Sequence, residues 1–340
     1  MRDAFAVAIA VPFLVGAALA PADAERDVAF RFADPAIVES SGLTAAGGLV
    51  TTVNDSGDSA RVFTVDATSG RTVGVTTWAG EPTDDEALAP AGDGEVWVGD
   101  IGDNAAARDD VTVTRVPVGR GDRSVAGESF RLVYPDGPAD AEALLAHPRT
   151  GRLFVVTKGV LGGEVYAAPS ALRADAPNRL RPVGDAPGIV TDGAFLPDGR
   201  HLLLRNYGRA FVLAFPSLEL VGGFDLPAQK QGEGIAVAPD GSVYASSEGV
   251  RSPVLRIAVP DEIVEAMSSP GSDPGGAGSG SGGSDDGTAG ADGADGSSAD
   301  APGVGLPDAS EPQRSAWPWL AGFLVLGLGL LVLIRALRPR

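Results

Sequence analysis

Five acidic residues recur along the chain, and each lies at the start of a short run of small and apolar residues. They are Glu39, Glu86, Glu142, Asp192 and Glu233, in the segments E-S-S-G-L, D-E-A-L-A, A-E-A-L-L, T-D-G-A-F and G-E-G-I-A. Carboxylate oxygens suit a hard cation such as Ca²⁺, and the chain has no cysteine to offer a softer donor. If the fold gathers these acids, they can hold Ca²⁺. If each instead accepts backbone N–H groups, they only fasten neighbouring elements.

The spacing of the five acids indicates the architecture that positions them. The intervals are about 40 to 56 residues, which is the size of one four-stranded propeller blade. Within each interval a short strand, a glycine turn and further β-rich segments follow one another, with P-D-G turns at 197–199 and 239–241. We therefore predict an all-β fold, a five-bladed β-propeller, or a six-bladed one if the long second interval contains another blade. A β-sandwich is the competing architecture, but it has no repeat of this length.

The two ends of the predicted propeller complement each other. The last repeat, after residues 253–257, lacks an outer strand, whereas Asp27–Phe32 at the other end forms a strand without a repeat of its own. We expect the N-terminal strand to complete the last blade, because this closure removes an exposed sheet edge.

Antiparallel pairing brings the start of each first strand beside the end of the second strand, so further side chains join the acids. The expected neighbours are Asn54 and Asp55 for Glu39, Asp100 for Glu86, Lys158 for Glu142, Arg205 and Asn206 for Asp192, and Glu248 for Glu233. First strands line the axis of a propeller, so all five groups should meet at one mouth of the central channel.

Two kinds of ligand are predicted for this mouth. The loop G-D-I-G-D-N adds a further oxygen donor, although neither it nor N-D-S-G-D matches an EF-hand. The predicted metal ligands are Glu39, Asn54, Asp55, Glu86, Asp100, Asp103, Glu142, Asp192, Glu233 and Glu248, and the predicted anion-binding residues are Lys158, Arg205 and Asn206.

Composition excludes several other kinds of chemistry. A formal net charge of −19 argues against nucleic acid as a partner, because two polyanions repel each other. The two histidines, His147 and His201, are not accompanied by a G-x-S-x-G elbow, so a serine-hydrolase triad is not indicated. The chain also lacks the G-x-x-x-x-G-K-[ST] loop that cradles nucleotide phosphates.

The chain ends predict export and anchoring. Residues 1–24 read as a signal peptide ending in A-D-A at Ala22–Ala24, with an uncleaved anchor as the alternative. Residues 316–335 form an apolar segment whose length fits one bilayer-spanning helix. Basic residues at 335, 338 and 340 then place the short tail 336–340 in the cytoplasm. The predicted location is the cell membrane, with a single pass and the propeller domain, 25–265, outside.

Between the propeller and the apolar segment, residues 266–315 are rich in Gly, Ser and Asp, which predicts a disordered stalk. Within it, Leu306–Ser310 resembles the L-P-x-T-G signal of sortases, but Ala309 and Ser310 replace the Thr and Gly. Cell-wall attachment is therefore the alternative to a membrane anchor.

The motifs E-S-S-G-L, N-D-S-G-D, V-G-D-I-G-D-N, D-A-E-A-L-L, V-V-T-K and G-E-G-I-A-V together resemble a family of exported actinobacterial propellers. The resemblance covers 37–257. That family is similar to the esterase-like phytase and SdiA-regulated propeller proteins, whose E-G-I-A and S-S-E-x motifs match 233–236 and 246–249. Phytase-type propellers hold calcium with channel carboxylates and phosphate with Lys and Arg. The resemblance thus implies calcium at Glu39, Glu86, Glu142 and Glu233, and phosphate at Lys158 and Arg205.

Two classes of function follow from these observations. In the first, the protein is a non-catalytic binding module that holds a cation and presents its loops to a cell-wall or other extracellular ligand. In the second, it is a calcium-dependent, phytase-like phosphoesterase or lactonase. The sequence favours the first class and leaves the second open.

Overall fold

The computed structural model describes residues 27–268, apart from Ser56 and Asp93. The predicted signal peptide, most of the predicted stalk, the apolar segment 316–335 and the basic tail lie outside these residues. Among the helices of the described part, none is long and apolar enough to cross a membrane.

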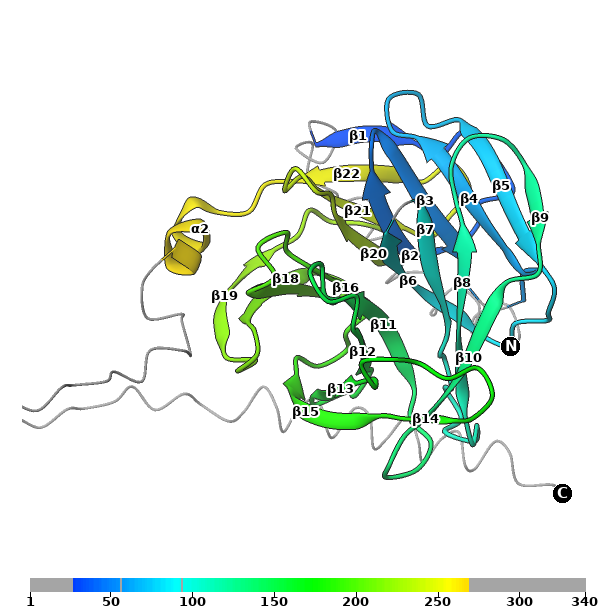
Figure 1. The fold of residues 1–340 in the computed structure, drawn as a ribbon. Helices are drawn as coiled ribbons and strands as arrows, with labels where there is room; N and C mark the ends of the chain where they lie inside the picture. Colours follow the sequence, from blue (N-terminus) through cyan, green and yellow to red (C-terminus); the bar gives the residue numbers. More distant parts are fainter. Residues whose placement is uncertain (1–26, 56, 93, 269–340) are drawn as a thin grey trace, which may run out of the picture. The chain divides into compact units, whose positions relative to one another are not determined.

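The described chain forms five β-sheets, which are the five blades of a propeller (Figure 1). Blade 1 contains β2 (Ser40–Ala46), β3 (Leu49–Asn54), β4 (Arg61–Asp66) and β5 (Thr72–Trp78). Blade 2 contains β6 (Asp85–Gly92), β7 (Glu95–Asp100), β8 (Val111–Pro117) and β10 (Glu128–Val133). Blade 3 contains β11 (Ala141–Ala146), β12 (Leu153–Thr157), β13 (Gly163–Ala167) and β15 (Arg181–Ala186).

The remaining two blades complete the ring. Blade 4 contains β16 (Asp192–Phe195), β17 (His201–Arg205), β18 (Arg209–Ala214) and β19 (Leu220–Asp225). Blade 5 contains β20 (Gly232–Val237), β21 (Val243–Ser247), β22 (Pro253–Ile257) and the N-terminal strand β1 (Val28–Arg31). In each sheet, one edge strand either carries a repeat acid or directly follows one. The predicted succession of strands within each repeat is therefore confirmed.

The first strands of the blades form the inner ring of the propeller. Each contacts the first strand of the next blade, in the cyclic order β2, β6, β11, β16, β20 and back to β2. Close approach of β2 and β6 depends on Gly42, because a Cβ at this position would lie 2.3 Å from the backbone nitrogen of Leu88. The ring therefore brings the starts of all five first strands to one end of the channel.

The predicted closure is confirmed. Strand β1 pairs antiparallel with β22, with Val28 opposite Leu255 and Arg31 opposite Pro253, and the blue N-terminal strand lies beside the yellow third strand in Figure 1. The free edge of blade 5 is thereby covered by the other end of the domain.

The long second interval contains an additional edge strand instead of a sixth blade. Strand β9 (Arg123–Val125) turns back and pairs parallel with β5, so it becomes the fifth strand of blade 1. A two-residue strand, β14 (Asn178–Arg179), extends blade 2 in the same way by pairing parallel with β10. The described residues thus contain five blades.

The hydrophobic core is divided into five clusters, one between each pair of neighbouring blades. Between blades 3 and 4, for example, Phe154, Phe195 and Phe215 meet edge-to-face or tilted, with ring centroids 5.1–5.5 Å apart. Such packing holds neighbouring blades in fixed orientation, and it fixes the loops at both ends of the channel.

One element was not anticipated. Helix α2 (Asp261–Ser268) follows blade 5 and includes the first three residues of the predicted stalk. Its first turn carries Asp261 and Glu262, which suit the positive end of a helix. Ile263 is buried in the cluster between blades 4 and 5 and lies against Gly222 of β19.

Candidate functional site

Three of the repeat acids lie at β-bulges at the start of the inner strands. The pairing of first and second strands shifts register at Glu86, between Asp85 and Ala87, at Glu142, between Ala141 and Ala143, and at Glu233, between Gly232 and Ile235. A bulge leaves one residue without a partner in the ladder and re-aims its side chain. The same shift in blade 1 contains Ser41.

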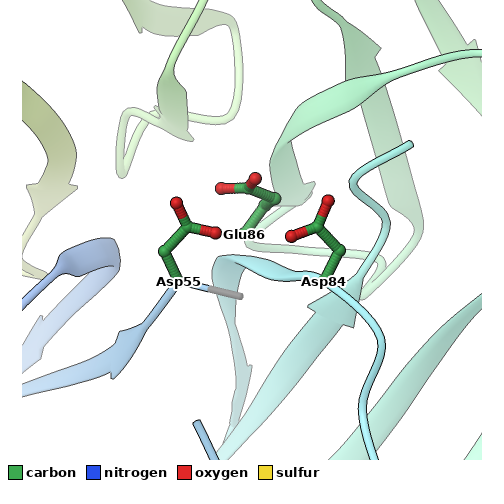
Figure 2. A group of neighbouring side chains, drawn as sticks. All are labelled: Asp55, Asp84 and Glu86. Carbon is green, nitrogen blue, oxygen red and sulfur yellow. The ribbon is translucent and has the colours of Figure 1, made fainter. Parts of the chain in front are cut away.

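Two further acids meet Glu86. The carboxylates of Asp55, Asp84 and Glu86 each offer one oxygen, and these oxygens all lie within 4.8 Å of one another. Figure 2 shows the three carboxylates converging on a common space between blades 1 and 2. Glu86 is buried, with 4% of its surface exposed, and its Oε2 accepts a hydrogen bond of 3.0 Å from the Ser41 hydroxyl. All three donors are carboxylate oxygens, so the cluster can hold a hard metal ion.

Burial and mutual repulsion make this cluster costly when it is charged. Burial raises the pKa of Glu86 to about 10, and the carboxylates of Glu142, Asp55 and Asp84 add to the effect. Burial likewise raises the pKa of Asp84 to about 6, with Asp55 and Asp140 as the next causes. A cation among these oxygens would lower both values by favouring the charged forms.

The neighbouring acid, Glu142, has a cation of its own. The Lys158 ammonium donates a hydrogen bond of 2.7 Å to Glu142 Oε1. Burial alone would lower the pKa of Lys158, but the hydrogen bond and charge of Glu142 raise it, so this lysine is charged at neutral pH. The pKa of Glu142 is nevertheless raised to about 7, because burial outweighs the stabilising effect of Lys158. The predicted pairing of Glu142 with Lys158 is therefore present.

Glu233 completes the group from blade 5. It is only 5% exposed, and its Oε2 is buried without a hydrogen-bond partner among the described residues. Burial and the charge of Glu142 raise its pKa to about 7, whereas Lys158 lowers it. Since a buried carboxylate oxygen without a donor is rare, it calls for a ligand, water or ion. We call Asp55, Asp84, Glu86, Glu142, Lys158 and Glu233 the acidic mouth.

The charged residues at the start of blade 4, Asp192 and Arg205, are buried inside the protein. Asp192, which pairs with Arg205 across the two strands, is fully buried, and its carboxylate accepts 2.7 Å hydrogen bonds from the N–H groups of Gly193 and Ile235. Burial raises the pKa of Asp192 well above its usual value. This acid therefore fastens blade 4 to blade 5, which is the structural role that the sequence left open for each repeat acid.

Arg205 is also directed inward. Its guanidinium, fully buried, donates to the carbonyl oxygens of Gly234 and Ser246 and to Gln229 Oε1. Asn206, the third predicted anion ligand, accepts N–H groups of its own turn and donates to a backbone carbonyl. Of the three predicted anion ligands, Lys158 is thus the one that lies in the acidic mouth, and it is paired with Glu142.

The remaining predicted ligands order the loops of the mouth or lie at its rim. Asn54 Oδ1 accepts hydrogen bonds from the N–H groups of Val38 and Glu39. Asp100 binds Arg108 at 2.8 Å and accepts the N–H of Asp84. Asp103 accepts N–H groups of its own loop, while Glu39 is exposed and Glu248, whose pKa is raised by burial and by Glu39, is partly exposed.

Sequence reasoning missed Asp84 and Asp85. Asp85 stands opposite Asp100 in the strand pairing, in the place expected for Glu86, because the bulge moves Glu86 out of the ladder. The available signal was the run of three acids, D-D-E, which is unusual at the start of a buried strand. Burial and Asp100 raise the pKa of Asp85 to about 8.

A cavity of about 760 Å³ occupies the rest of the channel and lies toward the end opposite the acidic mouth. Its lining comes from the later residues of all five inner strands, for example Leu43, Leu88, Leu144, Phe195 and Ala236. The two ends of the channel therefore differ in chemistry: one is acidic and the other is largely apolar.

No protein-family model matches this sequence, and no curated protein matches it. A luciferin-regenerating enzyme matches the fold with a TM-score of 0.38 and 10% identity, over 68% of this chain and 92% of the other. A streptogramin B lyase matches at 0.37 and 10%, over 65% of each chain. A candidate 6-phosphogluconolactonase from Bacteroides uniformis matches at 0.36 and 19%, over 63% of this chain and 65% of the other. Identities this low carry no information on ligand or activity.

Proposed function

We propose that the protein is an extracytoplasmic binding module whose acidic mouth holds Ca²⁺ at Asp55, Asp84 and Glu86. The observation that supports this proposal is the convergence of three carboxylate oxygens within 4.8 Å, at the channel end of two neighbouring blades. Burying a carboxylate beside two others is unfavourable unless protons or a cation compensate the charge. Calcium accepts irregular sets of oxygen ligands, whereas Mg²⁺ requires near-octahedral geometry, so this cluster suits calcium better.

Calorimetry with CaCl₂ tests the proposal. Calcium should raise the melting temperature of the parent protein, because the assembled site exists only in the folded state; at a concentration 100 times Kd the gain is about 2.7 kcal/mol. The variant Glu86→Gln keeps the size of the side chain and removes one ligand charge, so it should lose most of this gain. Glu219→Gln removes an exposed charge on the β18–β19 loop, at the other end of the propeller, and is the matched control. An equal calcium shift in parent and Glu86→Gln would contradict the site.

One observation supports a hydrolase as the second candidate function. The pKa values of Glu142 and Glu233 are both raised to about 7, mainly by burial, which is the range that suits a general base at neutral pH. The candidate reactions are hydrolysis of a phosphoester or of a lactone beside the bound calcium. A screen with both substrate classes decides between the two functions, because Glu142→Gln combined with Glu233→Gln should abolish any activity that the parent shows.

The location outside the membrane rests on the chain ends. Ending the chain at Ser315 removes the apolar segment and its arginines, so the truncated protein should appear in the medium while the full chain fractionates with membranes. Replacing Ala309 and Ser310 in the full chain tests whether the segment Leu306–Ser310 serves as a sortase signal for wall attachment. If the truncated chain still fractionates with membranes, the anchor is not where the sequence places it.

A further inference from the structure

Exposed apolar side chains gather around the acidic mouth. Seven large apolar side chains of the described chain are exposed, and five of them belong to the end of the propeller where the inner strands begin. These five are Val38 (38% exposed), Val160 (80%), Leu161 (100%), Tyr207 (42%) and Val250 (56%). We call them the apolar rim. The other two, Leu220 and Val264, lie on the outer strand β19 and on helix α2.

The strand order places the rim. Strands β12, β17 and β21 each end beside the start of an inner strand, as the pairs Ala141–Thr157, Asp192–Arg205 and Gly232–Ser247 show. The loops that follow these second strands carry Val160 and Leu161, Tyr207, and Val250. Val38 precedes β2 at the same end, and its carbonyl oxygen accepts a 2.7 Å hydrogen bond from the N–H of Gly249. The rim therefore spans blades 3, 4, 5 and 1.

The charge inside the rim is negative. Five carboxylates of the acidic mouth face one lysine, Lys158, which is paired with Glu142. Glu39 and Glu248 add two acids at its edge, where Lys230 is close enough to lower the pKa of Glu248. Two nearby arginines form ion pairs, Arg61 with Asp58 and Arg108 with Asp100, and Arg251, next to Val250, is exposed. A calcium ion on Asp55, Asp84 and Glu86 would leave this region still negative.

Two contacts show what kind of group the mouth accepts. The ammonium of Lys158 lies between the Glu142 carboxylate, at 2.7 Å, and the Tyr207 ring, 5.9 Å from its centroid. This is how a protein binds an alkylammonium group, with a carboxylate on one side and an aromatic face on the other. Close by, Glu233 has a buried acceptor oxygen that no donor of the described residues reaches.

We propose that the apolar rim and the acidic mouth together form the docking surface for a peptide segment of a partner protein that carries a lysine or arginine flanked by apolar residues. The proposal rests on the binding-module function and names its partner class. The basic side chain enters the acidic mouth, and the flanking apolar side chains cover Val160, Leu161 and Tyr207. Exposed apolar groups around a charged centre are typical of protein interaction sites. The negative charge selects basic segments and rejects acidic ones.

A random heptapeptide library displayed on phage tests the proposal against the full-length protein in calcium buffer. Selected peptides should carry a lysine or arginine next to an apolar residue. The most enriched peptide, labelled with fluorescein, is then titrated with the protein and its variants. Replacing both Val160 and Leu161 by serine should weaken its binding about tenfold or more, because the complex then buries less apolar surface.

Matched variants keep the outcomes separate. Leu220→Ser removes another exposed apolar side chain, 63% exposed, outside the rim and should leave binding unchanged. The calcium response of the parent and of the rim variant is measured separately by calorimetry without peptide, so the failure of one proposal is distinguishable from the failure of the other. The docking surface is overturned if no peptide is enriched, if the enriched peptides are acidic or uncharged, or if the rim variant binds like the parent.

Discussion

Arg205 is the largest fully buried side chain of the described propeller, and its position explains why blade 4 adds no exposed charge to the acidic mouth. Its guanidinium satisfies carbonyl groups of blade 5, and Asp192 satisfies N–H groups of the same region. Burial lowers the pKa of Arg205 to about 10, with Glu233 and Asp192 opposing this shift, so the side chain remains charged at neutral pH. At this position in the repeat, the pair links two blades.

Replacing Arg205 by Met should therefore destabilise the fold by about 3–5 kcal/mol, because it leaves several buried carbonyl groups without a donor and removes the positive charge that opposes the buried Asp192. The matched control is Arg209→Met, which removes an arginine of the next strand whose side chain is 53% exposed. Denaturant unfolding measures both variants. If Arg205 bound an anionic ligand, its replacement would instead abolish phosphate binding at little cost in stability.

At the scale of elements, the blades were predictable and the site was predictable only in part. Strand positions followed from the repeat, because the residues of each inner strand must be small and apolar to line a narrow channel. The additional strand at 27–32 indicated how the ring closes. The bulges at Glu86 and Glu142 were not predictable, because regular pairing keeps every side chain in a two-residue period. Asp84 was missed for the same reason: it joins Glu86 only because the strand bends there.

The loop after β7 positions Asp84 through Gly102. A Cβ at Gly102 would lie 2.3 Å from Asp84 Oδ2 and 2.5 Å from its Cγ, so alanine at this position must displace the carboxylate. Gly102→Ala should weaken calcium binding about tenfold, because the nearest clashing atoms belong to the Asp84 side chain. Gly99→Ala, in the same segment, meets nothing closer than 3.3 Å and is the control. A calcium titration of both variants gives the comparison, and equal affinities would exclude Asp84 as a ligand.

On the scale of the whole molecule, the propeller separates opposite chemistries at the two ends of one channel. Three of the five inner strands begin with an acid on a bulge, and all five continue with small and apolar residues, so the inner strands line both the acidic mouth and the apolar cavity. Closure by β1 joins the first and last blades, and the mouth draws its residues from both ends of the repeat. Loss of the contact between two neighbouring blades would therefore disturb the whole site.

This architecture predicts that, without calcium, the protein loses stability as the pH rises from 5.5 to 8. Burial raises the pKa of Asp84 to about 6, and of Glu142 and Glu233 to about 7, from ordinary values of 3.8 and 4.5. A carboxyl group whose pKa is raised by folding stabilises the folded state while it is protonated, and this contribution disappears as the pH rises through the folded-state pKa. Carboxylates with a lowered pKa do not interfere: Asp66, held at about 2 by its hydrogen bond to Arg120, titrates below this range.

The melting temperature without calcium should consequently fall by roughly 10 °C or more between pH 5.5 and 8, since one pKa unit corresponds to about 1.4 kcal/mol and each kcal/mol to roughly 2–4 °C for a domain of this size. Calcium should reverse the trend, because at pH 8 protons no longer compete for the carboxylates, so the calcium-induced shift is larger at pH 8 than at pH 5.5. Glu142→Gln combined with Glu233→Gln removes two of the titrating groups and should make the calcium-free profile less steep, while Asp85 and Glu86, whose pKa values are raised further, still contribute to it. Scanning calorimetry at both pH values, with EGTA and with CaCl₂, measures all four conditions. A calcium-free melting temperature that rises with pH would mean that these carboxyl groups are charged and paired in the folded protein, and the acidic mouth would then need no cation.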